Sequence, residues 1–332
     1  MKVLISGSFW HGSLEESYAR AFERMGWKVI RFDWEEVERT HPLAKIVAIG
    51  KLLHWRLADH AGQILVTVVK ETRPDLVLVI KGRSVHPEII QKLASLIPSQ
   101  MIVNFNPDSP WEPRNASKRI LEAIPLYRAH FTWNDGLIDH YTRAGAQAAH
   151  FLPFAHDPAL HYPIEAANPE FDAVFIGTYD EERDKLLSKL SGCKIGIWGN
   201  GWDRARYVPR DWVKGSAIYG EEATCILGSS ICALNILRPQ NRGGHNMRTF
   251  EIPATRHAML ATRSAMHERL FIEGKEAEFF DGVEELREKI AMLRQDPTHA
   301  NEIAKNGYER VKDETYIQRV ATMLDILGFS ID

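Results

Sequence analysis

Residues 241–262 read NRGGHNMRTFEIPATRHAMLAT. This stretch begins with polar residues and a glycine pair, continues with Arg248 and Glu251 one helical turn apart, and ends in the apolar run AMLA. The middle predicts a helix, and the apolar run predicts a buried strand. A helix that leads directly into a buried strand is typical of α/β folds. The stretch also raises a question of function, because charged side chains stand where the helix begins.

The residues before this stretch alternate apolar and amphipathic runs. The apolar runs predict strands at residues 2–6, 27–32, 76–80, 101–105 and 129–133. The amphipathic runs predict helices at residues 14–25, 44–72, 87–96, 116–124 and 135–144. Gly26 and Gly145 follow two of these helices, as glycine commonly does beyond a helix end. Buried strands that alternate with helices predict a parallel sheet covered on both faces.

Prolines and small polar residues cluster at 157–170, which predicts a linker between two domains. The alternation then starts again. Strands are predicted at residues 172–176, 194–198, 231–236, 258–262 and 278–280. Helices are predicted at residues 180–190, 221–229, 248–256, 283–294, 297–312 and 316–327. We therefore expect two doubly wound α/β domains, with ligands bound beyond the carboxyl ends of their strands.

Composition limits the possible functions. The 332 residues are 45% hydrophobic and 26% charged, with a net charge of −3, so nucleic acid is not an expected partner. The three cysteines form no C-x-x-C pair and no H-E-x-x-H occurs, so we expect no metal site. The first apolar run is short and precedes a glycine turn, and no run of about 18 apolar residues follows, so we expect a cytoplasmic chain without a transmembrane segment.

An ordered series of segments resembles a known family. The segments are FIGTYDEERDKLL (175–187), IGIWGNGW (195–202), ICALNI (231–236), NMRTFEIPATRHAMLAT (246–262) and EFFDGVEELREKIAMLRQDP (278–297). In this order they resemble the C-terminal half of GT-B glycosyltransferases, closest to the CgeB-like (spore-maturation) group. There an N-x-R-x-F-E element opens the nucleotide-binding helix. The first half of the chain matches only in architecture and in NPDSPW (106–111) and LPFAHDP (152–158).

The resemblance implies a GT-B fold, in which two Rossmann-like domains face each other across a cleft. It implies an acceptor-side domain at 1–160, a nucleotide-sugar domain at 170–315, and a C-terminal helix within 316–332 that packs back on the first domain. The implied enzyme is a hexosyltransferase-type glycosyltransferase of glycan biosynthesis. It would use a nucleotide-sugar donor, a glycan, protein or small-molecule acceptor, and no cofactor or divalent metal.

The opening stretch then has a functional interpretation. Gly243 and Gly244 let the backbone approach a diphosphate, next to His245 and Asn246 at the helix start. Arg248 can hold phosphate oxygens with two parallel hydrogen bonds. The resemblance implies that Glu251 accepts hydrogen bonds from the ribose. The alternative is a capped surface helix with a solvated arginine and glutamate.

Two turns of the same domain supply further candidates. Gly177 opens the first turn, and Arg183, six residues later, is a candidate phosphate ligand unless it pairs with Asp180 or Asp184. Trp202 follows the second glycine turn and is a candidate contact of the donor base or sugar, unless it packs in a core.

The first domain offers candidates for the acceptor side. His11 lies in the loop after the first strand, and a histidine can take a proton near neutral pH. Asp108 stands between two prolines that fix its loop, so it is the other candidate base. Its alternative role is a turn cap. Trp111 is a candidate platform for a sugar ring, and His156, near the expected domain crossing, is a candidate contact of the donor or acceptor sugar.

The sequence departs from the family in one respect. Retaining GT-B enzymes often carry E-x7-E, but the position eight residues before Glu251 is Gly243. The sequence therefore does not predict whether the anomeric configuration is retained or inverted. A GT-B epimerase or hydrolase, and a non-catalytic nucleotide-sugar or glycan-binding module, stay open as alternatives.

Overall fold

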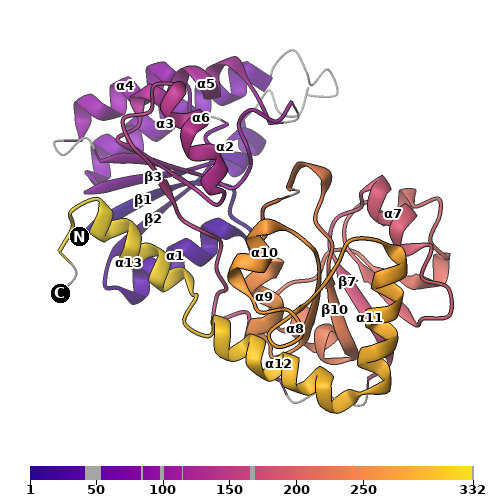
Figure 1. Ribbon diagram of the computed structural model, residues 1–332. Coiled ribbons are helices and arrows are strands. Elements are labelled where there is room, and N and C mark those ends of the chain that lie inside the picture. Colours follow the sequence, from indigo (N-terminus) through magenta and orange to yellow (C-terminus); the bar gives the residue numbers. More distant parts are fainter. Residues whose placement is uncertain are drawn as a thin grey trace. The chain divides into compact units, whose positions relative to one another are not determined.

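The computed structural model describes residues 1–41, 54–83, 85–97, 101–113, 115–164, 169–241 and 243–330 (Figure 1). Among these residues, the strands form two six-stranded sheets, in which all strand pairs are parallel. The chain divides into two compact units. The first unit is Met1–Pro153 with Arg319–Asp332, and the second is Phe154–Gln318. The predicted α/β class with parallel sheets is confirmed.

The first unit has the strand order β2-β1-β3-β4-β5-β6. Its strands are β1 (Lys2–Gly7), β2 (Lys28–Asp33), β3 (Leu76–Ile80), β4 (Ile102–Asn106), β5 (Ala129–Thr132) and β6 (Ala149–Phe151). Its helices are α1 (Leu14–Arg24), α2 (Trp34–Thr40), α3 (His54–Thr72), α4 (Pro87–Leu96), α5 (Lys118–Ala123), α6 (Ile138–Arg143) and most of α13 (Tyr316–Ile326). Residues 42–53, the first part of the helix expected at 44–72, lie outside the described residues.

Both faces of this sheet are covered, as its buried strands require. Leu65 of α3, Leu93 of α4 and Ala123 of α5 join one apolar core with Val77 and Val79 of β3. On the opposite face, the Tyr18 ring of α1 lies 5.5 Å from the Phe105 ring of β4.

The last residues of the chain belong to the first unit. Arg319 donates its Nε hydrogen to the Pro153 carbonyl at 3.0 Å. The Phe329 ring packs on Trp27 with 5.3 Å between centroids. The chain thus returns to the unit in which it began.

The second unit has the strand order β12-β11-β10-β7-β8-β9. Its strands are β7 (Phe171–Ile176), β8 (Ile195–Trp198), β9 (Val213–Gly215), β10 (Ser230–Asn235), β11 (Ala258–Thr262) and β12 (Glu278–Phe280). Its helices are α7 (Glu181–Leu187), α8 (Gly220–Gly228), α9 (Arg248–Ala254), α10 (Ala265–Leu270), α11 (Val283–Gln295) and α12 (Pro297–Val311). Figure 1 shows α7 and α11 on one side of these strands, and α9 and α10 on the other.

The order of the second sheet creates a switch point between β7 and β10. From β7 the chain continues to β8 and β9 on one side, and from β10 it continues to β11 and β12 on the other. Ligands of open parallel sheets bind beyond the carboxyl ends of the strands at such a point. The first sheet has its own switch point between β1 and β3.

Gly199 marks the closest approach of two turns in the second unit. Its φ is +150°, and a Cβ at this position would lie 2.0 Å from the Gly177 carbonyl oxygen. The turn after β7 therefore packs directly on the turn after β8, and only glycine fits between them.

We expect Gly199→Ala to destabilise the second unit more than Gly192→Ala. Gly192 also has a positive φ, +87°, but has no atom within 4 Å of its added Cβ. The control should cost about 1–2 kcal/mol for its left-handed backbone. Gly199→Ala should add roughly 1–3 kcal/mol of overpacking to a similar cost. Thermal unfolding of both variants measures the difference, and equal melting temperatures would contradict the close approach.

Candidate functional site

Arg183 joins the two strands of the switch point in the second unit. It lies on α7, which begins after its N-cap Asp180. The Arg183 side chain donates from Nε to the Ile236 carbonyl at 3.1 Å and from Nη1 to the Thr178 carbonyl at 3.0 Å. Its Nη2 also donates to Ile236. One guanidinium thus satisfies carbonyl groups that follow both β7 and β10.

The Arg183 guanidinium is buried yet still charged near neutral pH. Burial is the main cause that lowers its pKa to about 9, and the nearby positive charges of Arg238 and Arg248 lower it further, whereas Asp180 raises it. Three arginines therefore gather at this switch point. The predicted alternative, a pair with Asp180 or Asp184 on a solvated helix, does not describe Arg183, since it is only 8% exposed. Asp184 instead accepts from the backbone of Arg206 and Val208.

Arg248 is the first residue of α9 and reaches back to β7. Its Nε donates to the Ile176 carbonyl at 3.2 Å, and its Nη1 pairs with Oε2 of Glu251. The Arg248 side chain is 26% exposed and that of Glu251 is 5% exposed. Because α9 has only seven residues, we attribute the positive charge here to arginine side chains more than to the helix dipole.

His161, which was not among the residues predicted from the sequence, completes the surroundings of Glu251. Its Nε2 lies 3.9 Å from Glu251 Oε1, and its Nδ1 accepts the backbone N–H of Asp157 at 3.2 Å. Burial lowers the pKa of His161, so the neutral ring holds its proton on Nε2, toward Glu251. The histidine follows the LPFAHDP segment, but its distance in sequence from Glu251 gave no signal of this contact.

The loop before α9 is fixed by neighbouring elements. Gly243 adopts a left-handed φ of +84°. The Ser264 hydroxyl donates to the Gly244 carbonyl at 2.7 Å, and Asn246 Nδ2 donates to Asn235 Oδ1 at 2.8 Å. The His245 ring is fully buried between Phe154 and Phe250, and its Nε2 accepts the Phe154 N–H at 3.2 Å. The structure therefore gives His245 a packing role in place of the predicted contact with a diphosphate.

Trp202 and His156 also have structural roles. Trp202 is 2% exposed, belongs to the apolar core of the unit and donates its indole N–H to the Gly177 carbonyl at 2.8 Å. Its ring therefore supports the turns beside β7 and has no free face for a donor. His156 is 4% exposed, and its Nε2 lies 3.1 Å from the Val311 carbonyl. Its backbone pairs with Thr315 in a short parallel bridge. It ties the crossing segment to the residues after α12, which corrects its expected contact with a sugar.

Three charged side chains gather at the strand ends of the first unit. Lys81 Nζ, just after β3, lies 2.9 Å from Oδ2 of Asp108, just after β4. Glu15 of α1 accepts the Ser8 N–H at 3.1 Å, and burial raises the pKa of this carboxyl group, while Lys81 lowers it. The sequence did not predict this role for Glu15, because a glutamate in the first turn of a helix is ordinarily a solvated residue favoured by the helix dipole.

The other candidates of the first unit lie around this group. The Asp108 N–H donates to Asn106 Oδ1 at 3.1 Å, so Asn106 caps this turn, and the Asp108 carboxylate pairs with Lys81. The Trp111 ring packs 4.9 Å from that of Tyr141 and is half-buried. His11 is exposed in its turn.

A small pocket opens beside Lys81 in the same unit. Its volume is about 10 Å³, which is room for about one water molecule. The residues that line it include Lys81, Gly82, Asn104, Asn106, Pro110, Tyr127, His130 and Tyr141. Polar residues of β4 and the turn after β3 thus meet the apolar residues Ile120, Ala123 and Ile124 in this pocket.

Among the described residues, no group of three or more histidine, cysteine, aspartate or glutamate side chains could hold a metal ion. No helix within the described ranges is long and apolar enough to cross a membrane. The cysteines Cys193, Cys225 and Cys232 are free thiols.

Comparison with known proteins identifies the fold. A family model described as glycosyl transferase-like matches residues 183–325. The sucrose-phosphate synthase from Thermosynechococcus elongatus is similar in structure, with a TM-score of 0.73, 12% identity and coverage of 98% of this chain and 98% of that chain. Anabaena HepE in complex with UDP-glucose gives a TM-score of 0.66 and 13% identity over 98% of this chain and 100% of that chain.

A third similar structure is T4 phage BGT in complex with its UDP-glucose substrate. It gives a TM-score of 0.59 and 11% identity over 99% of this chain and 100% of that chain. No curated protein matches the chain. The chain has the GT-B fold of glycosyltransferases, and most of its second unit matches the glycosyl transferase-like model.

Buried histidines make the stability of the protein depend on pH. Burial lowers the pKa of His130, His156, His257 and His267 to about 4. In the unfolded chain these histidines bind protons as the pH falls below about 6.5, whereas in the folded chain they stay neutral until about pH 4. The stability present above pH 6.5 should therefore be lost progressively as the pH falls toward 4.

We expect each histidine to contribute a slope of about 1.4 kcal/mol per pH unit in this window. His257→Gln should remove one such contribution. Unfolding of the wild type and this variant between pH 4.5 and 8 measures the slopes. Identical slopes would show that His257 takes up its proton in the folded state.

Proposed function

We propose that the protein is a glycosyltransferase that moves a sugar from a nucleotide-diphosphate-sugar to an acceptor hydroxyl. The observation that carries the proposal is the gathering of Arg183, Arg238 and Arg248 at the switch point of the second sheet. The fold supports it, since two of the similar structures hold UDP-glucose. A UDP-sugar is therefore the donor class that we propose first.

In the proposed reaction the acceptor oxygen attacks the anomeric carbon. The bond between this carbon and the phosphate oxygen breaks, and the nucleoside diphosphate leaves with the electron pair. The acceptor proton passes to a base, for which Asp108 and His11 are the candidates from the sequence. Lys81 pairs with Asp108 and would hold its carboxylate in place.

The arginines would stabilise the charge of the leaving diphosphate. Such stabilisation acts on charge that develops in the transition state, and preorganised cationic groups supply it without reorganising. We therefore propose a metal-independent reaction. The contact of Glu251 with ribose, the membership of the CgeB-like group and the hexosyl type of the donor stay predictions from the sequence.

Nucleotide binding tests the proposal. We expect one nucleotide among UDP, GDP, dTDP, ADP and CMP, or the corresponding nucleotide-sugar, to raise the melting temperature. A ligand at 100 times its Kd stabilises the folded state by about 2.7 kcal/mol. Arg248→Ala should weaken binding at least about tenfold, because a hydrogen bond to a charged group contributes about 1.5–3 kcal/mol.

Arg256→Ala is the matched control, because Arg256 is an exposed arginine beyond the other end of α9. It should bind the nucleotide like the wild type. If no nucleotide shifts the wild-type melting temperature, the donor site is wrong. Consumption of the donor without any acceptor would instead favour the hydrolase or epimerase alternative.

A further inference from the structure

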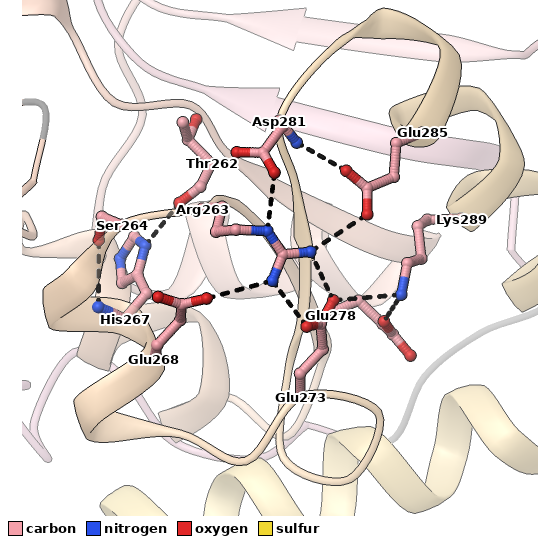
Figure 2. A network of polar contacts seen from close by, with 10 residues as sticks. All are labelled: Thr262, Arg263, Ser264, His267, Glu268, Glu273, Glu278, Asp281, Glu285 and Lys289. Carbon is pink, nitrogen blue, oxygen red and sulfur yellow. Dashed lines mark hydrogen bonds and ion pairs between the residues drawn. The ribbon is translucent and has the colours of Figure 1, made fainter.

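The turn between β11 and α10 clamps the loop that leads into α9. The Ser264 hydroxyl donates to the Gly244 carbonyl at 2.7 Å and caps α10 by accepting the His267 N–H at 3.0 Å. The His267 ring contacts the Thr262 carbonyl through Nδ1 at 2.8 Å and the Thr249 hydroxyl through Nε2 at 2.9 Å. Figure 2 shows Thr262, Ser264 and His267 together at this turn.

The protons in this cluster have a defined direction. Burial lowers the pKa of His267 to about 4, so its ring carries one N–H near neutral pH. A carbonyl can only accept, so Nδ1 holds the proton and donates to Thr262. Nε2 therefore accepts the hydroxyl hydrogen of Thr249.

The direction continues from Thr249 to Asn246. Since the Thr249 hydroxyl hydrogen is used, its oxygen accepts from Asn235 Nδ2 at 3.1 Å and from the Asn246 N–H at 3.3 Å. Asn246 in turn donates from Nδ2 to Asn235 Oδ1 at 2.8 Å. His267, Thr249, Asn235 and Asn246 thus form a relay of hydrogen bonds, in which the Thr249 hydroxyl donates to His267 and accepts from both asparagines.

The opposite side of the same turn is held by charge. Arg263 points away from His267 toward carboxylates of the following elements (Figure 2). Its guanidinium contacts Asp281 at 2.9 Å, Glu273 at 2.7 Å and Glu285 at 3.1 Å. The Arg263 N–H also donates to the Phe280 carbonyl at 2.9 Å. The turn before α10 is therefore held by Arg263 on one side and by Ser264 and His267 on the other.

We infer that His267 is a positioning residue for the nucleotide site, acting through the Thr249 hydroxyl on Asn246 and on the adjacent Arg248. The inference rests on the proposed function, since it assigns His267 to the same diphosphate site. His267 itself is fully buried, so it would act on the site only through its neighbours. Its role is to hold one conformation of residues 243–249, so that Arg248 meets the diphosphate without reordering.

Isosteric variants test the relay. Thr249→Val keeps the volume and removes the hydroxyl, whereas Thr249→Ser keeps the hydroxyl. His267→Phe keeps a ring that can stack on Phe279, whose centroid is 5.9 Å away, and removes both nitrogens. We expect Thr249→Val and His267→Phe to raise the Kd for UDP at least about tenfold, since a buried partner loses its hydrogen bond. Thr249→Ser should stay within about threefold of the wild type.

Two controls separate positioning from general destabilisation. His257→Gln changes another buried histidine of the same unit, which contacts the Thr255 hydroxyl at 3.0 Å and lies outside the relay. It should lower the melting temperature and leave the Kd for UDP unchanged. The double variant Thr249→Val/His267→Phe should weaken binding no more than either single variant, because both substitutions break the same hydrogen bond between Thr249 and His267. Wild-type affinity in folded His267→Phe and Thr249→Val would overturn the inference.

Hydrogen exchange without ligand keeps the inference separate from the proposed function. We expect the amides of residues 243–249 to exchange at least about tenfold faster in His267→Phe than in His257→Gln, because the loop opens locally. If the wild type binds no nucleotide, the proposed function fails while this measurement still reports on the relay. Equal exchange in the two variants would show that His267 does not hold the loop.

Discussion

The buried guanidinium of Arg183 is the interaction on which the second unit depends at its switch point. Strands of a parallel sheet end in carbonyl groups that no further strand can satisfy, and buried carbonyl groups need a partner. Arg183 supplies donors to the carbonyls after β7 and β10 at once. Because both crossovers leave the sheet at this point in opposite directions, no backbone segment could serve both carbonyls in the same way.

Arg183 thus places a positive charge in a buried position. A buried charge is costly unless hydrogen bonds surround it, and here the carbonyl oxygens do so. Arg183 also lies over the Phe175 ring, with 5.1 Å to the centroid. The protein therefore keeps a cation at the carboxyl ends of the central strands β7 and β10, and Arg238 and Arg248 increase the positive potential there.

The periodicity of the sequence predicted most of the long elements, because apolar runs such as β3 and β11 are buried on both faces. Short elements escaped prediction. The edge strands β6 and β9 have three residues each, and none of those six residues is fully buried, so they carry no periodic signal. The helix α10 has six residues and is specified by its Ser264 cap and by tertiary contacts of His267.

The same limit applies to the candidate site. Arg248 and Glu251 stand one turn apart on one helix and form an ion pair, although the sequence led us to expect separate contacts with phosphate and ribose. His161 reaches Glu251 from a segment 90 positions earlier, and Lys81 reaches Asp108 from a neighbouring strand. Sequence patterns identify residue types at strand ends, but the pairing of those ends follows from strand order. His245 shows the converse, since a polar residue in a glycine-rich loop can serve packing.

The arginines of the switch point differ in what they can still do. Three of the five N–H groups of the Arg183 guanidinium already donate to carbonyls, and Arg183 is only 8% exposed. In the proposed site, Arg183 would therefore act on a phosphate mainly through its charge, which a low-dielectric environment screens weakly. Arg248 is more exposed, and its contact with Glu251 leaves donors available at the first residue of α9. In the proposed site, Arg183 would hold the carboxyl ends of β7 and β10 together and supply a fixed positive charge, whereas Arg248, next to Thr249 in the sequence, would make the directional contact with the diphosphate.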